Sequence, residues 1–409
     1  MNHISSKLIS AAAGRRDDYQ VPIALAEAGL LASHVTDVYM PDALVPVLRQ
    51  LGARGSRLLR RHSPQLRSRL VHPSARLVVL KAIASLIPSL KNRLMGDQDP
   101  ISWTALAQAR RHHAGLLLYA GYAYRAFTAE SHSARRRGLI QYHPHIRDSA
   151  AILRADAKRH PFIRTALEQL RHDEQDYTNS PELEIADLVI CNSTFTAATC
   201  RSLGIEGSKL LVIPYGIDPI PPSGATPNEL IPKDSSVCQF LFVGSGIQRK
   251  GLHHLLLAWK QAGLKHSRLT IVSRWIDPEI RSAIDPGEGV RWLDSVNNQQ
   301  LDRLYQQSDV FVMPSLIEGF GYVYLEAMAR GCFCIGTANT GLPDVATPGS
   351  SAVVPAGDLE QLADALQVTE QRRHEGEFDR AAIASAGAAR NWCDFRANVV
   401  SAVQSYLMT

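Results

Sequence analysis

The sequence predicts an α/β protein built from two doubly wound domains with parallel sheets. In the second half, short apolar runs alternate with amphipathic segments, which is typical of βαβ units on a sheet covered on both faces. The first half alternates in the same way, less regularly. A stretch rich in proline, residues 219–236, lies between the halves and predicts a linker. With 409 residues, 45% of them hydrophobic, the chain can bury two cores of ordinary size.

The apolar runs give the expected elements in order. In the first half we expect strands at 116–119, 139–142, 186–191 and 209–213. In the second half we expect strands at 239–243, 269–272, 290–293, 310–313 and 333–335, and helices at 252–262, 301–307 and 322–329. Near the end of the chain, apolar residues at helical spacing predict a last helix that packs back across the domain boundary: Trp392, Phe395, Val399 and Val403. The predicted domains are therefore 1–218 and 237–389, with a returning helix in 390–409.

Charge is distributed unevenly between the halves, although the net charge is only +5. Residues 1–220 hold 28 Lys and Arg against 19 Asp and Glu, and residues 43–96 contain eleven basic residues and no acidic one. An anionic partner is one interpretation of this basic insert, and a solvated surface is another. Anionic lipid fits because residues 77–90 are largely apolar with basic edges. Nucleic acid is not expected, because no aromatic residue interleaves with the arginines.

The cysteines and the hydropathy pattern indicate the cellular compartment. The six cysteines have no metal-ligand spacing, which favours reduced, buried thiols of a cytosolic protein. The N-terminal residues lack the apolar core of a signal peptide, and no run approaches the roughly 20 apolar residues of a spanning helix. We expect a cytoplasmic protein, peripheral at the inner face of the membrane if residues 43–96 bind lipid.

The most informative stretch is 309–331. A buried strand ends at Pro314, a loop with Gly319 and Gly321 lets the backbone approach a ligand, and a helix begins near Tyr322, where unpaired N–H groups can face an anion. Two carboxylates flank this helix start, Glu318 and Glu326, and can accept hydrogen bonds from the hydroxyls of a sugar and of a ribose. The alternative is an ordinary strand, loop and helix with two solvated carboxylates.

This stretch resembles the Glu-x7-Glu signature of the retaining glycosyltransferases of family 4, the glycosyl transferases group 1, including Pro-Ser before it and Glu-Ala-Met-Ala after it. Further segments resemble other parts of that family: 242–251 its glycine-rich donor loop, 187–193 and 213–218 the end of its acceptor domain, and 14–37 its first glycine loop, with Gly14. The resemblance implies the GT-B fold, in which two Rossmann-like domains face a central cleft.

The resemblance also implies a donor site. Lys250 stands in the place of the family's diphosphate-binding lysine, and Phe320 lies in the loop between Glu318 and Glu326. Where the family commonly has an arginine, this chain has Ser245, which cannot supply that charge; whether Arg249 replaces it stays open.

Two further parts of the site follow from family analogy. The nucleotide base is expected against the strand ends at 273–275 or at Trp292 and Leu293. A histidine from the first domain often completes such sites, and His143 and His145 are equal candidates because both follow an expected strand.

The function implied is transfer of a sugar, with retention, from a nucleotide-diphosphate sugar to a glycan or lipid-linked acceptor in cell-envelope polysaccharide synthesis. No cofactor or metal is expected, because side-chain cations can stabilise the leaving diphosphate; Asp97-Gln-Asp99 is interpreted as a turn. The alternatives are a catalytically weak donor-binding subunit that acts through a protein partner, and a sugar-nucleotide epimerase. A nicotinamide dehydrogenase is excluded by the absence of a Gly-x-Gly-x-x-Gly loop after an N-terminal strand.

Overall fold

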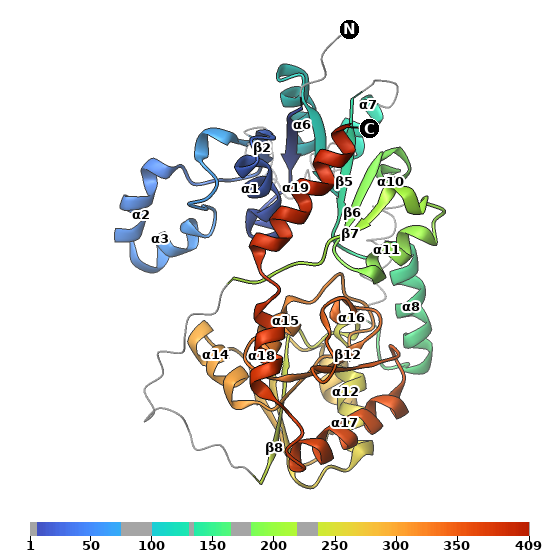
Figure 1. Ribbon diagram of the computed structural model, residues 1–409. Coiled ribbons are helices and arrows are strands. Elements are labelled where there is room, and N and C mark those ends of the chain that lie inside the picture. The colour runs from blue at the N-terminus through green and yellow to red at the C-terminus, as the bar shows by residue number, and fades with distance from the viewer. Residues whose placement is uncertain (1–5, 75–99, 131–134, 165–180, 219–235, 409) are drawn as a thin grey trace.

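The computed structural model describes residues 6–74, 100–130, 135–164, 181–218 and 236–408 (Figure 1). Most of the predicted linker, part of the basic insert, the apolar run 77–90 and Asp97-Gln-Asp99 lie outside the described residues. Two parallel sheets organise the chain, one in each half.

The first sheet has seven strands in the order β3-β2-β1-β4-β5-β6-β7 and the second has six in the order β10-β9-β8-β11-β12-β13. Every strand pairing in both is parallel. The strands are β1 Leu8–Ala11, β2 Leu31–Thr36, β3 Val71–Pro73, β4 Gly115–Tyr119, β5 Arg137–Gln141, β6 Leu188–Cys191, β7 Leu210–Val212, β8 Cys238–Val243, β9 Ser267–Val272, β10 Val290–Leu293, β11 Val310–Val312, β12 Phe333–Thr337 and β13 Ser351–Val354.

Helices connect the strands. Those of the first half are α1 Gln20–Glu27, α2 Val45–Gln50, α3 Gly52–Leu59, α6 Pro100–Arg111, α7 Tyr124–Ala129, α8 Ile146–Arg159, α10 Glu182–Ile185 and α11 Thr194–Arg201. Those of the second half are α12 Leu252–Ala262, α13 Pro278–Ala283, α14 Asn298–Gln307, α15 Tyr322–Met328, α16 Leu342–Val345, α17 Leu359–His374, α18 Arg380–Ala388 and α19 Trp392–Met408. Among the described helices, none is long and apolar enough to cross a membrane.

Both sheets wind outward in two directions from a central strand pair. The first winds from β1 through β2 to β3 and then restarts at β4, and the second winds from β8 to β10 and restarts at β11. Because crossovers between parallel strands are right-handed as a rule, reversing the direction puts helices on opposite faces of the sheet. The predicted α/β, doubly wound, two-domain fold is confirmed. In such a fold, ligands bind beyond the carboxyl ends of the two strands where the direction reverses.

The apolar runs that predicted strands are buried. Val310 and Phe311 are fully buried and pair with β8 on one side and β12 on the other. The strands within residues 6–74 were not predicted. In β2 the reason is that the strand carries polar residues, which the fold also buries, among them Ser33, His34 and Thr36. One ring nitrogen of His34 has a local partner, since its Nδ1 lies 2.6 Å from the Ser10 hydroxyl on the neighbouring strand.

The last helix returns to the first half, as predicted. Figure 1 shows α19, in red, running up from the lower domain along the upper one, beside α1. Its predicted apolar positions are all buried: Trp392, Phe395, Val399 and Val403. On its polar side, Arg396 donates to Gln20 of α1 at 2.7 Å and pairs with Glu27 at 2.9 Å.

A second helix extends from the first half onto the second half. α8 follows β5 of the first sheet, but Ala150 and Leu153 pack against Leu316 and Ile317, which follow β11 of the second sheet. This packing brings the end of β5 over the point where the second sheet reverses direction.

Candidate active site

The loops after β8 and β11 meet at the reversal point of the second sheet. Lys250 ends the loop after β8, and Glu318 lies in the loop after β11. The Lys250 ammonium pairs with the Glu318 carboxylate, and Arg249 Nη1 lies 3.1 Å from the same Oε2. Arg249 also donates to the carbonyl of Ile317 at 3.2 Å. The three residues therefore form a connected cluster, and Glu318 is buried within it.

Glycine at 251 lets these loops touch. Gly251 has a φ of 69°, and a Cβ there would lie 1.9 Å from the carbonyl oxygen of Pro314. Only a residue without a side chain fits this position. The backbone contact fixes Lys250 beside the Glu318 loop.

The charges in this cluster shift the pKa values of Glu318 and Lys250. Burial by itself would raise the pKa of Glu318, but Lys250 and Arg249 outweigh burial and hold the pKa below its usual value. Burial lowers the pKa of Lys250, while Glu318 opposes that shift. The cluster accordingly contains an ionised carboxylate between two cations.

The structure separates the two candidate histidines. His143, in the loop after β5, faces this cluster: burial first, and then the positive charge of Arg249, lower its pKa to about 4, while Glu318 acts in the opposite sense. Its side chain nevertheless remains accessible to solvent. His145 caps α8 instead, since its Nδ1 accepts a hydrogen bond from the Arg147 backbone at 3.2 Å. His143 is therefore the histidine that the fold brings to Glu318.

The glycine-rich loop between the predicted carboxylates packs against the first half. A Cβ on Gly319 would lie 2.2 Å from the carbonyl oxygen of Tyr142, and the Thr196 hydroxyl donates to the Gly319 carbonyl at 3.3 Å. Phe320 is buried against the ring of Tyr215. Gly321, with a φ of 88°, precedes the first residue of α15. The loop is thus held in place from both domains.

Glu326 lies apart from Glu318, in a pocket of about 520 Å³ between the halves. The Tyr305 hydroxyl donates to Glu326 Oε2 at 3.1 Å. Residues of both halves line this pocket: Arg15, Asp17, Asp18, Gly216, Ile217, Asp218, Tyr322, Glu326, Arg330 and Trp392.

The first half contributes a strained turn to this pocket. Asp17, Asp18 and Tyr19 all have positive φ, of 44°, 49° and 64°, a conformation that costs on the order of 1–3 kcal/mol for each such residue. Strain of this size is retained where the surrounding structure holds it in place, commonly at functional sites. The turn follows β1, at the point where the first sheet reverses direction.

Asp17 connects this turn to the second half. The Tyr322 hydroxyl, at the start of α15, donates to Asp17 Oδ1 at 3.1 Å. Burial raises the pKa of Asp17, and the hydroxyls of Tyr215 and Tyr119 act against that rise. Sequence reasoning missed this turn; the signal was the charged run Arg15 to Asp18 directly after an apolar strand and Gly14.

The remaining predicted donor residues are Gly14, Ser245, Trp292 and Leu293. Gly14 has a φ of 77° and donates its N–H to Asp37 at 2.8 Å, just before the strained turn. Ser245 is exposed in the loop after β8. Trp292, with Leu293 at the end of β10, lines a different pocket from Glu326 and lies under Arg281, whose guanidinium carbon is 5.6 Å from the ring centroid. The structure does not bring Trp292 to Glu326.

Comparison with known proteins gives a family for the second half. Residues 238–369 match the model of the family described as glycosyl transferases group 1. This match covers β8 to α17 and includes the loops that hold Lys250, Glu318 and Glu326.

Curated relatives match over limited regions. A GDP-mannose-dependent monoacylated alpha-(1-6)-phosphatidylinositol monomannoside mannosyltransferase of Corynebacterium glutamicum is 30% identical over 154 residues, which are 35% of this chain and 39% of the relative. A D-inositol 3-phosphate glycosyltransferase of Mycobacteroides abscessus is 34% identical over 113 residues, 27% of this chain and 25% of the relative. The alignments thus span less than half the length of either relative.

Solved structures match over nearly the whole chain. Sucrose-phosphate synthase from Thermosynechococcus elongatus superposes with a TM-score of 0.58 at 19% identity, over 96% of this chain and 97% of that one. At this identity the likeness concerns the fold, and the neighbours are GT-B glycosyltransferases. The chain has the GT-B fold, and its residues 238–369 match the model of the glycosyl transferases group 1 family.

Proposed function

We propose that this protein is a retaining glycosyltransferase that moves a sugar from a nucleotide-diphosphate sugar to a glycan or lipid-linked acceptor. The observation that supports this most is the cluster at the reversal point of the second sheet, where buried Glu318 holds Lys250 and Arg249 opposite His143 of the first half.

In this proposal Lys250 and Arg249 stabilise the leaving diphosphate as its negative charge develops. Both cations are already oriented by Glu318, so little rearrangement is needed when the donor binds. Arg249 provides the second positive charge that Ser245 cannot supply. With two side-chain cations at the site, the transfer is proposed to proceed without a catalytic metal.

Glu318 and His143 are proposed to contact the donor sugar. The ionised carboxylate of Glu318 accepts hydrogen bonds from sugar hydroxyls. With a pKa of about 4, His143 is neutral near pH 7, so it can orient a hydroxyl beside the forming oxocarbenium without adding a positive charge.

Glu326 is proposed to bind the ribose of the nucleotide. Its pocket of about 520 Å³ lies within the size range of small-ligand sites. The guanidinium groups of Arg15 and Arg330 in the pocket walls suit an anionic nucleotide.

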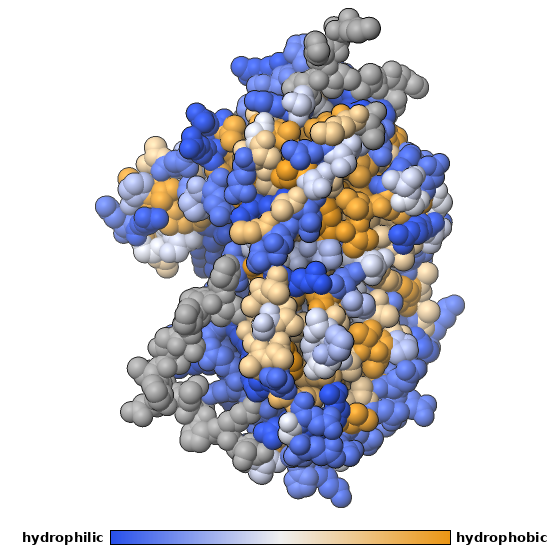
Figure 2. Space-filling view, in the orientation of Figure 1, coloured by the Kyte–Doolittle hydropathy of each residue, from blue (hydrophilic) through white to orange (hydrophobic). Residues whose placement is uncertain are grey.

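A membrane-bound acceptor is supported by the projection formed by α2 and α3. Leu44, Val47, Leu51 and Leu58 are exposed there, beside Arg49, Arg54 and Arg57, which are exposed as well. Figure 2 shows hydrophilic and hydrophobic residues intermixed at this projection, at the left of the view. Apolar side chains among cations are what an anionic membrane interface binds. One named relative acts on a phosphatidylinositol monomannoside, which is a lipid, and this agrees with an acceptor of this kind.

The alternatives are less well supported. A catalytically weak donor-binding subunit would not need the ion pairs that orient Lys250 and Arg249. A sugar-nucleotide epimerase is not favoured, because the family match and the named relatives are glycosyltransferases.

The test begins with the full chain and a panel of nucleoside diphosphates and their sugars. Selective binding of one nucleotide identifies the donor base. Incubation of that donor with inositol phosphates and with lipid extracts should then release the nucleoside diphosphate, and the NMR coupling constant of the anomeric proton in the product reports retention or inversion. Release of a free epimer without transfer would favour the epimerase, and an inverted product would contradict the retaining mechanism.

A further inference from the structure

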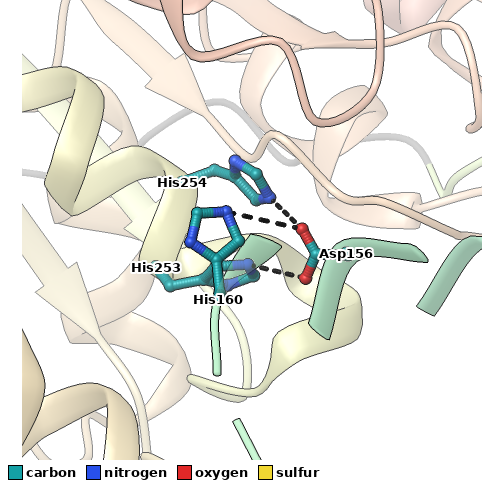
Figure 3. A group of neighbouring side chains, drawn as sticks. All are labelled: Asp156, His160, His253 and His254. Atoms are coloured by element: carbon teal, nitrogen blue, oxygen red, sulfur yellow. Dashed lines mark hydrogen bonds and ion pairs between the residues drawn. The ribbon is translucent and has the colours of Figure 1, made fainter. Parts of the chain in front are cut away.

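A cluster of side chains outside the active site joins the two halves. Asp156 is on α8, His160 follows that helix, and His253 and His254 lie in the first turn of α12 (Figure 3). One potential ligand atom from each of the four lies within 4.8 Å of all the others. His253 Nε2 is 3.0 Å and His254 Nε2 is 2.6 Å from the two carboxylate oxygens, and His160 Nε2 is 3.7 Å away.

The cluster has an unusual charge balance. Asp156 is completely buried, as is His253, and His254 is almost so. Among the described residues, the partners of this carboxylate are imidazoles and the amide of Gln248, with no Lys or Arg. A carboxylate thus lies buried among three imidazoles, although a buried charge ordinarily has a compensating partner.

The same features match a divalent metal site. Metal ions bind neutral imidazoles and ionised carboxylates, and three imidazole nitrogens with one carboxylate oxygen form a common zinc ligand set. Bonds of about 2.0–2.2 Å in a tetrahedral site separate the ligand atoms by about 3.3 Å. The separations of 2.6, 3.0 and 3.7 Å between the His Nε2 atoms and the two oxygens of Asp156 lie on either side of that value.

We propose that Asp156, His160, His253 and His254 bind one zinc ion that joins α8 of the first half to α12 of the second. Four protein ligands fill the coordination sphere, as in structural zinc sites, so the ion has no open position for a substrate.

The site has a consequence for the donor loop. Gln248 Nε2 donates to Asp156 Oδ2 and to the Leu153 carbonyl, both at 2.8 Å. Gln248 directly precedes Arg249 and Lys250, and His253 follows them by three residues. The zinc ion therefore anchors both ends of the segment that carries the two cations, and it acts as a positioning element rather than as part of the reaction.

The first experiment measures metal in the full chain. Protein stripped with a chelator is titrated with Zn²⁺ against a chromophoric indicator, and bound zinc is measured after gel filtration by mass spectrometry. We expect one equivalent, together with a higher melting temperature, because zinc binds the folded state. A substoichiometric trace in the wild type would overturn the proposal in favour of a cluster held by hydrogen bonds alone.

Variants and spectroscopy identify the ligands. Asp156→Asn and His254→Ala should weaken zinc binding by more than about 100-fold, beyond the cost of losing a supporting residue, whereas His112→Ala, at an exposed histidine, should leave it unchanged. Equal zinc binding by all three variants would contradict the site. If the ligand variants do not fold, X-ray absorption of the zinc-loaded wild type decides: imidazole and oxygen neighbours at about 2.0–2.2 Å support the site, and a shell of water oxygens refutes it.

Discussion

Glu318 is the residue that connects the charges of the candidate active site. Its carboxylate orients Lys250 and Arg249, and its own pKa is kept low by them. The positions of the two cations therefore depend on one buried side chain. Substitutions here should change the rate of transfer more than the stability of the domain.

Replacing Lys250 tests the electrostatic part of the mechanism. We expect Lys250→Ala to lower kcat by about 10²- to 10³-fold, as the loss of one preorganised charge or donor does in other enzymes. The measurement is the initial rate of nucleoside diphosphate release with donor saturating. Lys260→Ala is the matched control, because Lys260 is exposed on α12 of the same domain. A rate for Lys250→Ala equal to that of this control would show that Lys250 does not contact the diphosphate.

The pH dependence of transfer follows from His143. Its pKa of about 4 lies below the ordinary 6.5, so the neutral imidazole persists through pH 5 to 8 and charges only below that range. The surrounding charges are Arg249, Glu318, Arg16 and Lys250. We expect the rate of sugar transfer to be constant above pH 5. On further acidification the rate should fall, because His143 takes up a proton. In His143→Gln the rate should be lower at pH 7 and this acidic limb should be lost; a wild-type inflection near pH 6.5 would contradict the assignment.

Sequence motifs predicted the residues of this cluster, but not their partners. Lys250, Arg249 and Glu318 follow from the two loops of the second half, which resemble a known family. His143 and His145 could not be distinguished, because both follow the same strand and only the start of α8 shows that His145 caps a helix. The strained turn at Asp17 was missed because the charged run after Gly14 marks a loop but does not show that three non-glycine residues adopt positive φ.

At the scale of elements, the α2 and α3 projection lies within residues 43–139, which the family resemblance does not cover. Its basic and apolar residues are adjacent and exposed. Figure 1 shows α2 and α3 extending to the left from the body of the upper domain. A surface of this kind can contact a membrane while the cleft stays open to donor.

One substitution tests this surface. Val47→Glu should reduce co-sedimentation with vesicles that contain anionic lipid, because the charge opposes insertion and repels the lipid headgroups. Val368→Glu on α17 is the matched control, since the two valines are 55% and 54% exposed. Both variants should keep the wild-type melting temperature. Sedimentation that is independent of anionic lipid, or equal losses in the two variants, would remove the membrane interpretation.

Helices and strands were predicted correctly where the buried residues are also the hydrophobic ones. The strands β8 to β12 of the second half were predicted within a few residues because they are largely apolar, and α19 was predicted from its buried stripe. The strands β1, β2, β3 and β13 were not predicted. β3 and β13 are short and largely exposed or half-buried, and β2 buries polar residues that pair across the sheet, such as His34 with Ser10.

At the scale of the whole molecule, the two-domain fold and the returning last helix were predictable, and the crossing of α8 onto the second domain was not. Alternating strands and helices around a linker imply two doubly wound domains and a ligand site between them. The crossing of α8 onto the second domain places Asp156 beside His253 and His254, which are 97 and 98 residues away in sequence. The only local signal was the spacing of four between Asp156 and His160, which puts both on one side of a helix end.

The position of the Glu326 pocket gives a prediction that depends on both halves. Glu326 and Arg15 line it from opposite domains, so a nucleotide bound there should contact both. Each hydrogen bond to a charged group contributes about 1.5–3 kcal/mol, or roughly 10- to 150-fold in Kd. We expect Glu326→Ala and Arg15→Ala each to weaken nucleotide binding in that range, measured by calorimetry with the nucleotide selected from the panel.

The exposed residues Glu360 and Arg268 provide the controls Glu360→Ala and Arg268→Ala. If Glu326→Ala weakens binding and Arg15→Ala does not, the nucleotide is held by the second domain alone, and domain closure is not part of donor recognition. If neither does, the nucleotide binds elsewhere, and the second pocket beside Trp292 becomes the site to test.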